Sequence, residues 1–478
     1  MNKDDFSCDA LVIGTGLGAS SFTYGLAKRG KDVVVIEQGD YFRPPSPDLA
    51  PLHNFNFANL AIVGGLSKSY GAAMYRLRER DFQPIEMERG PTPGWPISYA
   101  DLEPFYGEAE RLFKVHGSSE HEIAEPPRST PWPYPPIEHQ GPAADLVRRL
   151  REKADMSVSY VPLGKDYDPA NGGACVLCRH CDGYWCPRDA KMDAEVAALR
   201  PAVATGRVRV MTHTECLRIL TSPDGRRATG ALLRRDGREF TVHASIVGLG
   251  CGLRGTPILL YRSRTSAQPN GLGNGGGALG RYWSAHTAGW VFAMSPFVQR
   301  QKFHQKTFAM NGWYEHSSDW PYPTGIVQSA CYIEPTGISR RFRYFAQAIL
   351  AHSLHTFVMN EAVSSRETGF ALSDNEAKTI APPLENVKSF ARLRRLTIQM
   401  YRAAGYPAIS PPLKPTSYHS TGTARMGRDP NTSVCDERCQ VHDVAGLHVV
   451  DSTVLPSSGC LNSGLTVAAN ALRAAALA

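Results

Sequence analysis

The stretch ALVIGTGLGASSFTYGLAKRGKDVVVIE, residues 10–37, decides the fold. It opens with a short apolar run at 10–13, continues through a glycine-rich turn, and is followed by a segment up to Gly30 with apolar residues at helical spacing. A second strand-like segment, 32–36, comes next. Strand, tight turn, helix and strand in this order predict an α/β fold built on a parallel sheet.

The turn in this stretch has the composition of a dinucleotide-binding turn. Gly14 permits the tight turn, Gly16 lets the backbone approach a pyrophosphate, and the small Ala19, next to Gly18, allows the helix to pack closely on the strand. Glu37 lies 23 positions after Gly14, near the place of the acidic residue that binds a ribose hydroxyl. An acidic residue here disfavours the 2′-phosphate of NADP, so FAD and NAD remain.

Length and composition indicate a globular protein of more than one domain. The chain has 478 residues, of which 42% are apolar and 20% charged, and no apolar run is long enough to span a bilayer. The net charge of +7 is dispersed, and its densest clusters, at 76–80, 148–153 and 339–343, are typical of solvated faces, so no nucleic-acid partner is expected. The N-terminus leads directly into a strand without a signal peptide, which predicts a cytoplasmic protein.

A second run of small residues, at 62–76, predicts a place where backbone passes close to something flat or bulky. We interpret it as the second wall of a cofactor pocket, although close packing within the protein would also use small residues. Since 64–75 contains no His or Cys that could bond covalently to a flavin, a bound flavin is expected to be noncovalent. The candidate cofactor-binding residues in this run are Gly64, Gly65, Ser67, Gly71 and Ala72.

Several motifs together resemble the glucose-methanol-choline (GMC) oxidoreductases. They are GTGLGA with Glu37, GGLSKSYGAAMYR at 64–76, GWPISYADLEPFY at 94–106, HSTGTARMG at 419–427, and VVDSTVLP followed by NSGLT between 449 and 466. The resemblance implies FAD as the dinucleotide and a Rossmann-like FAD-binding domain with an inserted α+β substrate-binding domain. It places the FAD-binding domain at 1–85, 205–285 and 425–478, and the substrate-binding domain at 86–204 and 286–424.

The resemblance also implies further cofactor contacts. Val210 would lie at the adenosine half of FAD, Gly250 near the pyrophosphate, and Asp451 near the ribityl and pyrophosphate groups. The helix after NSG would direct its N-terminal partial positive charge at the flavin, with Ser463 and Leu465 among the cofactor-binding residues.

The chemistry of the family requires a base, because an alcohol carbon releases hydride only when its oxygen is deprotonated or nearly so. His419 begins the H-x-x-G-T pattern and is the candidate base; the alternative is that it caps a turn. Asn462 occupies the second catalytic position, where an amide can orient the alcohol but cannot take its proton. Asn462 could also be a plain helix cap, and Ser463 stands where many relatives have proline.

These residues predict an FAD-dependent oxidoreductase acting on the CH–OH group of a sugar-like or other alcohol, with hydride transfer to flavin N5. The electron acceptor would be oxygen or a redox partner. Two alternatives are a dehydrogenase subunit that passes electrons through an iron–sulfur cluster, and a non-redox hydroxynitrile lyase of the GMC type.

Four cysteines crowd into one loop, 175–186. Cys175, Cys178, Cys181 and Cys186 have the spacing C-x2-C-x2-C-x4-C-P, one residue longer in the last gap than a bacterial ferredoxin run. They are candidate ligands of an iron–sulfur cluster. A structural cysteine loop without metal and a zinc site are the alternatives.

The remaining chain predicts a helix at 143–155, strands at 207–211, 215–222, 231–235 and 239–244, a buried strand at 245–250, and a proline-rich turn at 43–48. Between 287 and 410 we expect strands mixed with one helix, at 387–404, and most of the aromatic residues there are expected in the core. His286, at the start of this region, is expected to be a core or surface histidine rather than a catalytic one.

Overall fold

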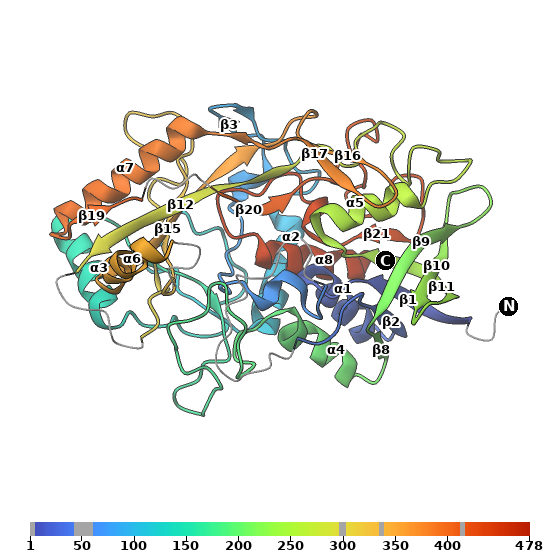
Figure 1. The fold of residues 1–478 in the computed structure, drawn as a ribbon, viewed down its shortest axis with the longest axis horizontal. Helices are drawn as coiled ribbons and strands as arrows, with labels where there is room; N and C mark the ends of the chain where they lie inside the picture. Colours follow the sequence, from blue (N-terminus) through green and yellow to red (C-terminus); the bar gives the residue numbers. More distant parts are fainter. Residues whose placement is uncertain (1–4, 43–60, 296–302, 334–338, 412–415) are drawn as a thin grey trace.

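The computed structural model describes residues 5–42, 61–295, 303–333, 339–411 and 416–478. Two sheets organise these residues, one on each side of the molecule in Figure 1. The predicted turn at 43–48 lies outside the described residues.

The first sheet contains the glycine-rich turn and is mainly parallel. Its strands run in the order β8-β2-β1-β11-β10-β9, and β21 pairs with the end of β11. Strands β8, β2, β1, β11 and β21 are parallel, while β10 and β9 form an antiparallel extension. The bounds are β1 Phe6–Ile13, β2 Val33–Ile36, β8 Val208–Met211, β9 Thr214–Thr221, β10 Ala228–Arg235, β11 Arg238–Leu249 and β21 Leu447–Val449.

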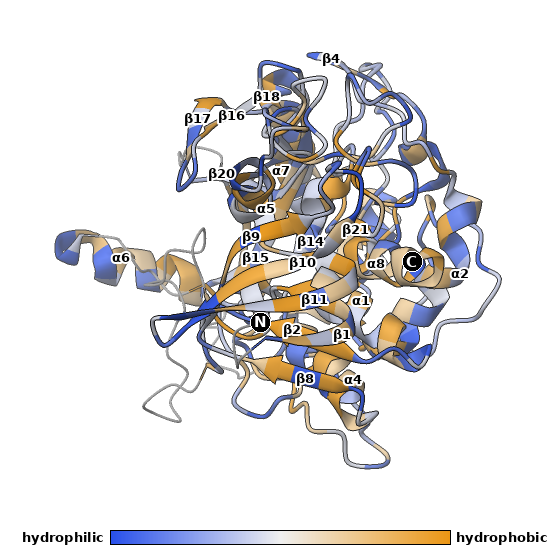
Figure 2. Ribbon diagram, turned by 90° about the vertical axis from the view of Figure 1, so that its right-hand side faces the viewer, coloured by the Kyte–Doolittle hydropathy of each residue, from blue (hydrophilic) through white to orange (hydrophobic). Residues whose placement is uncertain are grey.

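The two strands predicted at 239–244 and 245–250 form one continuous strand, β11. Its residues up to His243 pair with β10, and its last three residues pair with β21. The sequence suggested a division near 244 because the partner changes there, but the backbone does not break. The apolar strands β1, β2 and β11 lie side by side in Figure 2.

Helices follow the central strands β1 and β11 of the first sheet. Helix α1, Leu17–Lys28, follows β1 and packs against α8, Gly464–Leu477, while α5, Gly252–Arg262, follows β11. The face of α1 that meets the sheet is apolar, with Phe22 and Leu26 almost fully buried in the largest core. This arrangement is an α/β doubly wound unit, as the sequence predicted.

The second sheet is antiparallel and carries the H-x-x-G-T motif that begins at His419. Its strands run in the order β19-β12-β15-β14-β13-β6, with β20 beside β12 and β18 beside β15. Helices α3, Gly141–Ala154, and α7, Val387–Ala403, pack on it, where Leu150 and Leu393 join its apolar core. The strand bounds are β6 Ser159–Tyr160, β12 Ser284–Met294, β13 Phe308–Met310, β14 Ile326–Ser329, β15 Ser353–Val363, β18 Leu384–Glu385, β19 Ala408–Ile409 and β20 Thr416–Thr421.

Between 287 and 410 the structure contains a second helix, α6, Arg340–Ala351, in addition to the predicted α7. This helix extends away from the body of the molecule in Figure 2. Its aromatic residues are exposed: Phe342 by 58%, Tyr344 by 81% and Phe345 by 69%. These three residues therefore do not lie in the core, where aromatic residues of this region were expected. Leu350 is the only buried residue on α6.

The smaller elements connect the two sheets. Helix α2, Tyr99–Leu112, begins at the Ser98 cap and packs against α8, with Tyr106 Oη 2.8 Å from Thr466 Oγ1. This contact joins the segment expected in the substrate-binding domain to α8, the helix expected to face the flavin, and the domain boundaries stay a prediction. The other bounds are β3 Glu86–Met87, β4 Gly90–Pro91, β5 Val115–His116, β7 Leu163–Gly164, α4 Arg200–Ala204 after a π-helical turn at Glu195–Leu199, and 3₁₀ turns at Gly65–Lys68, Glu79–Phe82 and Ser452–Val454.

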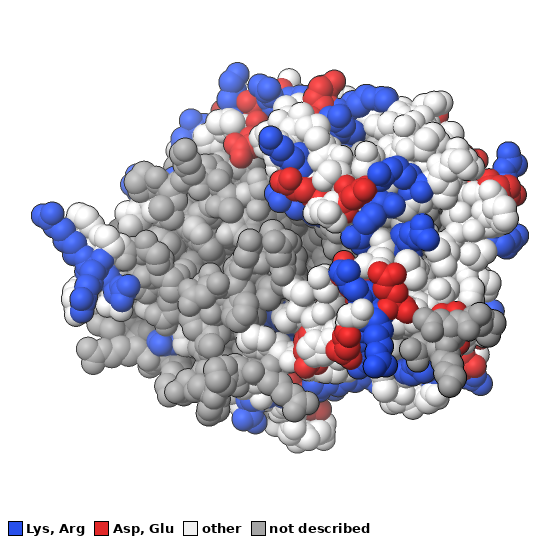
Figure 3. Space-filling view, turned by 45° about the vertical axis from the view of Figure 1, so that its right-hand side comes forward, with Lys and Arg blue, Asp and Glu red and all other residues white. Residues whose placement is uncertain are grey.

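Acidic and basic side chains are interspersed on the face shown in Figure 3. Among the helices of the described segments, none combines the length and the apolar character needed to cross a bilayer.

Candidate active site

The predicted dinucleotide turn lies between β1 and α1. Gly14 has φ 95°, a left-handed conformation that favours glycine. A Cβ on Gly18 would lie 1.7 Å from the carbonyl oxygen of Val450, whereas a Cβ on Gly16 would meet no protein atom within 4 Å. Because the Gly16 cap of α1 has no side-chain hydrogen bond, the first amides of the helix are available to an anion such as a pyrophosphate.

Glu37 follows β2 and is suited to holding a ribose. Its carboxylate accepts hydrogen bonds from Thr15 Oγ1 at 2.6 Å and from the Gly39 amide at 3.1 Å. Burial raises the pKa of Glu37, against the lowering effect of these hydrogen bonds. A carboxylate has lone pairs for about four hydrogen bonds, so Glu37 can still accept from ribose hydroxyls.

The run of small residues at 62–76 lies directly against this turn, as a second wall would. A Cβ on Gly65 would lie 3.3 Å from Gly16 Cα, and the Gly64 amide donates to Thr15 Oγ1 at 3.1 Å. Ser67 contributes to folding the wall, since its hydroxyl donates to the Gly64 carbonyl oxygen at 2.6 Å.

The far end of this wall is tightly constrained. Ala72 has φ 57°, which is strained for a residue with a Cβ. A Cβ on Gly71 would lie 1.6 Å from Asp182 Oδ1, so glycine is required where the cysteine-rich loop reaches the wall.

The remaining predicted cofactor residues lie at the ends of neighbouring strands. Val210 is on β8, paired with Val35, and Gly250 follows β11, where its Cβ would lie 2.6 Å from Ala19 Cβ. This close approach confirms that small residues are needed where α1 packs on the sheet. Ser463 and Leu465 are buried at the start of α8, whose N-cap has no side-chain hydrogen bond.

Asp451 is already bonded within the protein. One carboxylate oxygen accepts from the Gly252 amide at 2.8 Å and from Thr256 Oγ1 at 2.6 Å, and the other accepts from the Thr453 amide at 2.9 Å. It therefore joins the end of β21 to the start of α5. A direct contact of Asp451 with a cofactor stays a prediction.

His419 is held on β20 in a strained conformation. Its φ of 51° lies in the left-handed region, which costs a non-glycine residue about 1 kcal/mol or more and is concentrated at functional sites. Strand β20 pairs with β12 so that Tyr418 is opposite His286. The pairing brings the two histidines together although they are 133 residues apart in sequence.

The hydrogen bonds of His286 define the protonation of His419. His286 Nε2 lies 2.7 Å from the carbonyl oxygen of Gly459, which can only accept, so this nitrogen carries the proton. The other nitrogen, Nδ1, lies 2.9 Å from His419 Nδ1 and, in the neutral ring, must accept from it. His419 therefore carries its proton on Nδ1 and presents an unprotonated Nε2.

Burial favours the neutral form of both rings. Burial lowers the pKa of His286 to about 4. The pKa of His419 is also lowered well below its usual value, first by burial and then by the charges of His286 and Lys306. A neutral imidazole with a free lone pair can accept a proton.

Asn462 is held beside the free nitrogen of His419. Its Nδ2 lies 3.4 Å from His419 Nε2, and its Oδ1 accepts from Gln328 Nε2 at 3.0 Å. Because Gln328 occupies the carbonyl side of the amide, the NH2 side faces the histidine. The structure thus brings the two predicted catalytic residues together.

Sequence reasoning missed the roles of His286 and Gln328. His286 is expected from the sequence to be a core or surface histidine; it is fully buried, but it also contacts the candidate base. No local motif surrounds either residue, and only the pairing of β12 with β20 and of β14 with β15 reveals their positions.

The four cysteines of the 175–186 loop are not equivalent. Among the described residues, only Cys181 of the four belongs to a group of three metal-ligating side chains, and its companions are His304 and Cys331. The iron–sulfur site on the four loop cysteines stays a prediction.

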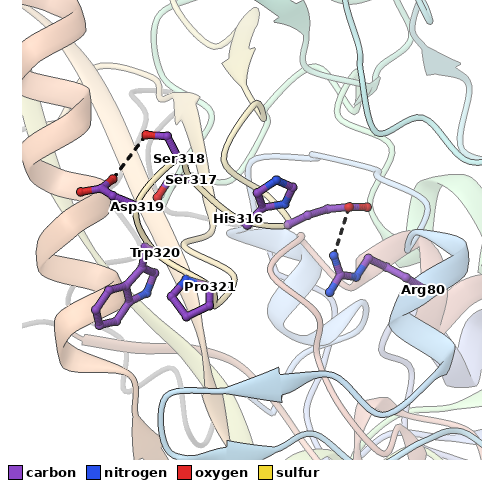
Figure 4. A pocket seen from close by; sticks show the side chains of 8 residues that line it. Arg80, His316, Ser317, Ser318, Asp319, Trp320 and Pro321 are labelled. Carbon is purple, nitrogen blue, oxygen red and sulfur yellow. Dashed lines mark hydrogen bonds and ion pairs between the residues drawn. The ribbon is translucent and has the colours of Figure 1, made fainter.

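A surface cavity of about 590 Å³ contains none of the predicted site residues (Figure 4). Arg80 pairs with Glu315 across it at 3.2 Å, and the turn 316–321 forms its other wall. Its lining contains neither the glycine-rich turn nor His419, so the candidate active site is defined by the hydrogen-bonded residues above.

Comparisons with known proteins identify the family of the chain. Two family models described as GMC oxidoreductase match residues 61–288 and 402–471. The chain is 28% identical to 6'''-hydroxyparomomycin C oxidase of Streptomyces lividus, over 97% of this chain and 90% of that protein. It is 28% identical to paromamine 6'-oxidase of Streptomyces fradiae (99% and 91% covered) and 24% identical to the fructose dehydrogenase large subunit of Gluconobacter japonicus (99% and 98%).

The fold has a solved counterpart. The crystal structure of pyridoxine 4-oxidase from Mesorbium loti matches with a TM-score of 0.68 at 16% identity, over 98% of this chain and 99% of that one. The glycine-rich turn, Glu37 and the uncapped helix start suit the FAD that this family binds. The chain belongs to the GMC oxidoreductase family and is an FAD-dependent oxidoreductase.

Proposed function

We propose that this protein oxidises a CH–OH group of a sugar-like substrate, with His419 as the base and Asn462 as the residue that orients the alcohol. The observation that carries the proposal is the chain of contacts from the Gly459 carbonyl oxygen through His286 to His419, which leaves His419 Nε2 unprotonated and facing the Asn462 amide.

The base step follows from these contacts. An alcohol oxygen within reach of both His419 Nε2 and Asn462 Nδ2 donates its proton to the histidine and accepts a hydrogen bond from the amide. The amide hydrogen bond stabilises the negative charge that develops on the oxygen as the proton leaves. The positive charge that develops on His419 is shared with His286 through the Nδ1 contact.

FAD, when bound, supplies the acceptor of the hydride, flavin N5. The chain would hold its pyrophosphate at the start of α1 and its ribose at Glu37. The N-terminus of α8 would face the flavin with its partial positive charge. The wall at 64–75 has no His or Cys, so acid precipitation should release all of the flavin.

The substrate class rests on the relatives. Two of them are named as oxidases of paromamine and of a hydroxyparomomycin, and one as a fructose dehydrogenase subunit. Another, at 26% identity, is named 2-methyl-1,2-propanediol dehydrogenase, so the sugar ring is not required of every relative. We favour sugars and amino sugars over simple alcohols.

The test is an anaerobic panel of sugars, glycosides, amino sugars and aryl alcohols, scored by loss of the oxidised flavin absorbance. Bleaching by one of the sugar-type compounds supports the proposal. A flavin that stays oxidised with every compound, together with cyanide release from a cyanohydrin, would instead support a hydroxynitrile lyase.

The electron acceptor is proposed to be oxygen or a redox partner. Reoxidation of the bleached enzyme by air identifies an oxidase. Slow reoxidation by air with fast reoxidation by an artificial acceptor identifies a dehydrogenase. Detection of iron and acid-labile sulfide in the protein would support the iron–sulfur cluster predicted on the loop cysteines. A cytoplasmic location is proposed as well, and cell fractionation tests it.

A further inference from the structure

Three buried metal-ligating side chains converge at a point that the proposed function does not use. Cys181 comes from the cysteine-rich loop, His304 lies just before β13, and Cys331 just after β14. Their ligand atoms all lie within 4.8 Å of one another. Their exposures are 7%, 1% and 0%, so bulk water does not solvate them.

The spacing of these atoms suits a tetrahedral metal ion. His304 Nδ1 lies 3.7 Å from Cys331 Sγ. With Zn–S near 2.3 Å and Zn–N near 2.0 Å, a nitrogen and a sulfur ligand of tetrahedral zinc lie about 3.5 Å apart. Shifts of less than about 1 Å would therefore bring the three ligand atoms to bonding distance.

A fourth ligand is beside the group. Cys178 lies outside the group of three: its thiol donates to the His180 carbonyl oxygen at 3.5 Å, and its own carbonyl oxygen lies 3.1 Å from His304 Nδ1. Without a metal, Nδ1 donates to that carbonyl, and the other ring nitrogen of His304 is buried with no hydrogen-bond partner among the described residues. With Cys178 added as the fourth ligand, three thiolates and one imidazole would make a closed set of the kind that holds structural zinc.

The charge around the group supports a thiolate-rich centre. Lys165 is buried, with 1% exposure, and its Nζ lies 3.0 Å from Cys181 Sγ. A buried ammonium needs a negative partner. Zn²⁺ with three thiolates has a net charge of −1, which the ammonium of Lys165 balances.

The surrounding contacts hold the ligands in place. Asp182, next to Cys181, accepts from the Cys331 amide at 2.8 Å and pairs with Lys306. The same carboxylate occupies the space that a Cβ on Gly71 would need. The group therefore lies where the cysteine-rich loop joins the second sheet to the wall of the cofactor site.

We propose that Cys178, Cys181, Cys331 and His304 bind one Zn²⁺ ion that fastens the 175–186 loop to the second sheet. The ligand set differs from the four loop cysteines of an iron–sulfur cluster, because it omits Cys175 and Cys186 and recruits two residues from beyond position 300. It does not depend on the identity of the substrate.

The test measures metal in the FAD-loaded protein purified without chelators. We expect about one zinc per chain in the wild type, less than about 0.2 in Cys331→Ser and in His304→Gln, and about one in the matched loop control Cys175→Ser. Zinc below about 0.2 per chain in the wild type would overturn the proposal. Iron with acid-labile sulfide, lost in Cys175→Ser, would overturn it in favour of the cluster.

Loss of zinc through misfolding is distinguished by a second measurement on the wild type. Cobalt(II) exchanged into the centre should give a thiolate-to-cobalt charge-transfer band and tetrahedral d–d bands. The zinc centre would be contradicted if these bands are absent. It would also be contradicted if Cys181 and Cys331 resist thiol reagents at first but react once a disulfide reductant is added.

Discussion

Replacing His286 with phenylalanine tests how the active-site histidine is held. An aromatic ring is retained, but the acceptor for His419 Nδ1–H and the donor to the Gly459 carbonyl oxygen are both lost. An unsatisfied buried polar group costs about 1–3 kcal/mol. Rotation of His419 or a change of its tautomer would relieve that cost, but the base would then no longer present an unprotonated Nε2 to the alcohol. We therefore expect kcat/KM to fall roughly 5- to 150-fold, the rate factor that corresponds to this free energy.

Glutamine at the same position is the matched rescue. Its amide offers one donor and one acceptor, so His286→Gln can donate to Gly459 and accept from His419. We expect it to recover most of the rate lost in His286→Phe. His355→Phe, at another fully buried histidine of the second sheet, controls for loss of stability alone.

The assay is anaerobic flavin reduction by a substrate found in the panel, normalised to FAD content. FAD content should stay near that of the wild type in both His286 variants. The proposed role of His286 is refuted if the flavin of His286→Phe is reduced at the wild-type rate, or if that of His286→Gln is reduced as slowly as that of His286→Phe although both variants bind FAD fully.

Three further predictions concern the base, its partner and the cofactor turn. Because burial lowers the pKa of His419 below its usual value, the base is unprotonated at neutral pH; kcat/KM should be flat above about pH 7 and fall only in acid, and a rise between pH 7 and 9 would contradict this. Gln328→Leu should lower kcat/KM about 3- to 10-fold at unchanged FAD content, since the Asn462 amide loses the donor that fixes its orientation; an unchanged rate would count against that role. Gly16→Ala should fold normally but bind FAD poorly, because its Cβ enters the open face of the turn, whereas Gly18→Ala should be destabilised because its Cβ would collide with Val450. Thermal melting and flavin content separate the two variants, and full FAD binding by Gly16→Ala would contradict the prediction.

Local sequence patterns predicted the parts of the fold that short-range physics determines. The strand-turn-helix at 10–30 formed as expected, because the apolar runs, the glycines and the helical spacing all favour the same structure. Strand β11 was divided in the prediction because its pairing partner changes along its length, which no local pattern records.

The site depends more on contacts between distant segments. His419 and Asn462 belong to recognisable motifs, but His286 becomes meaningful only when β12 pairs with β20. The cysteine loop shows the same limit, because the spacing of its four thiols gives no sign of His304 or Cys331. Helix α6 was missed because its aromatic residues are exposed, contrary to the usual burial of such side chains.

The most direct test of the account is the rate of anaerobic flavin reduction in His419→Ala. If His419 is the base, this variant should bind FAD at wild-type level and reduce it on the order of 10²–10⁴ times more slowly. A variant that binds FAD and is reduced at nearly the wild-type rate would contradict the assignment of His419 as the base.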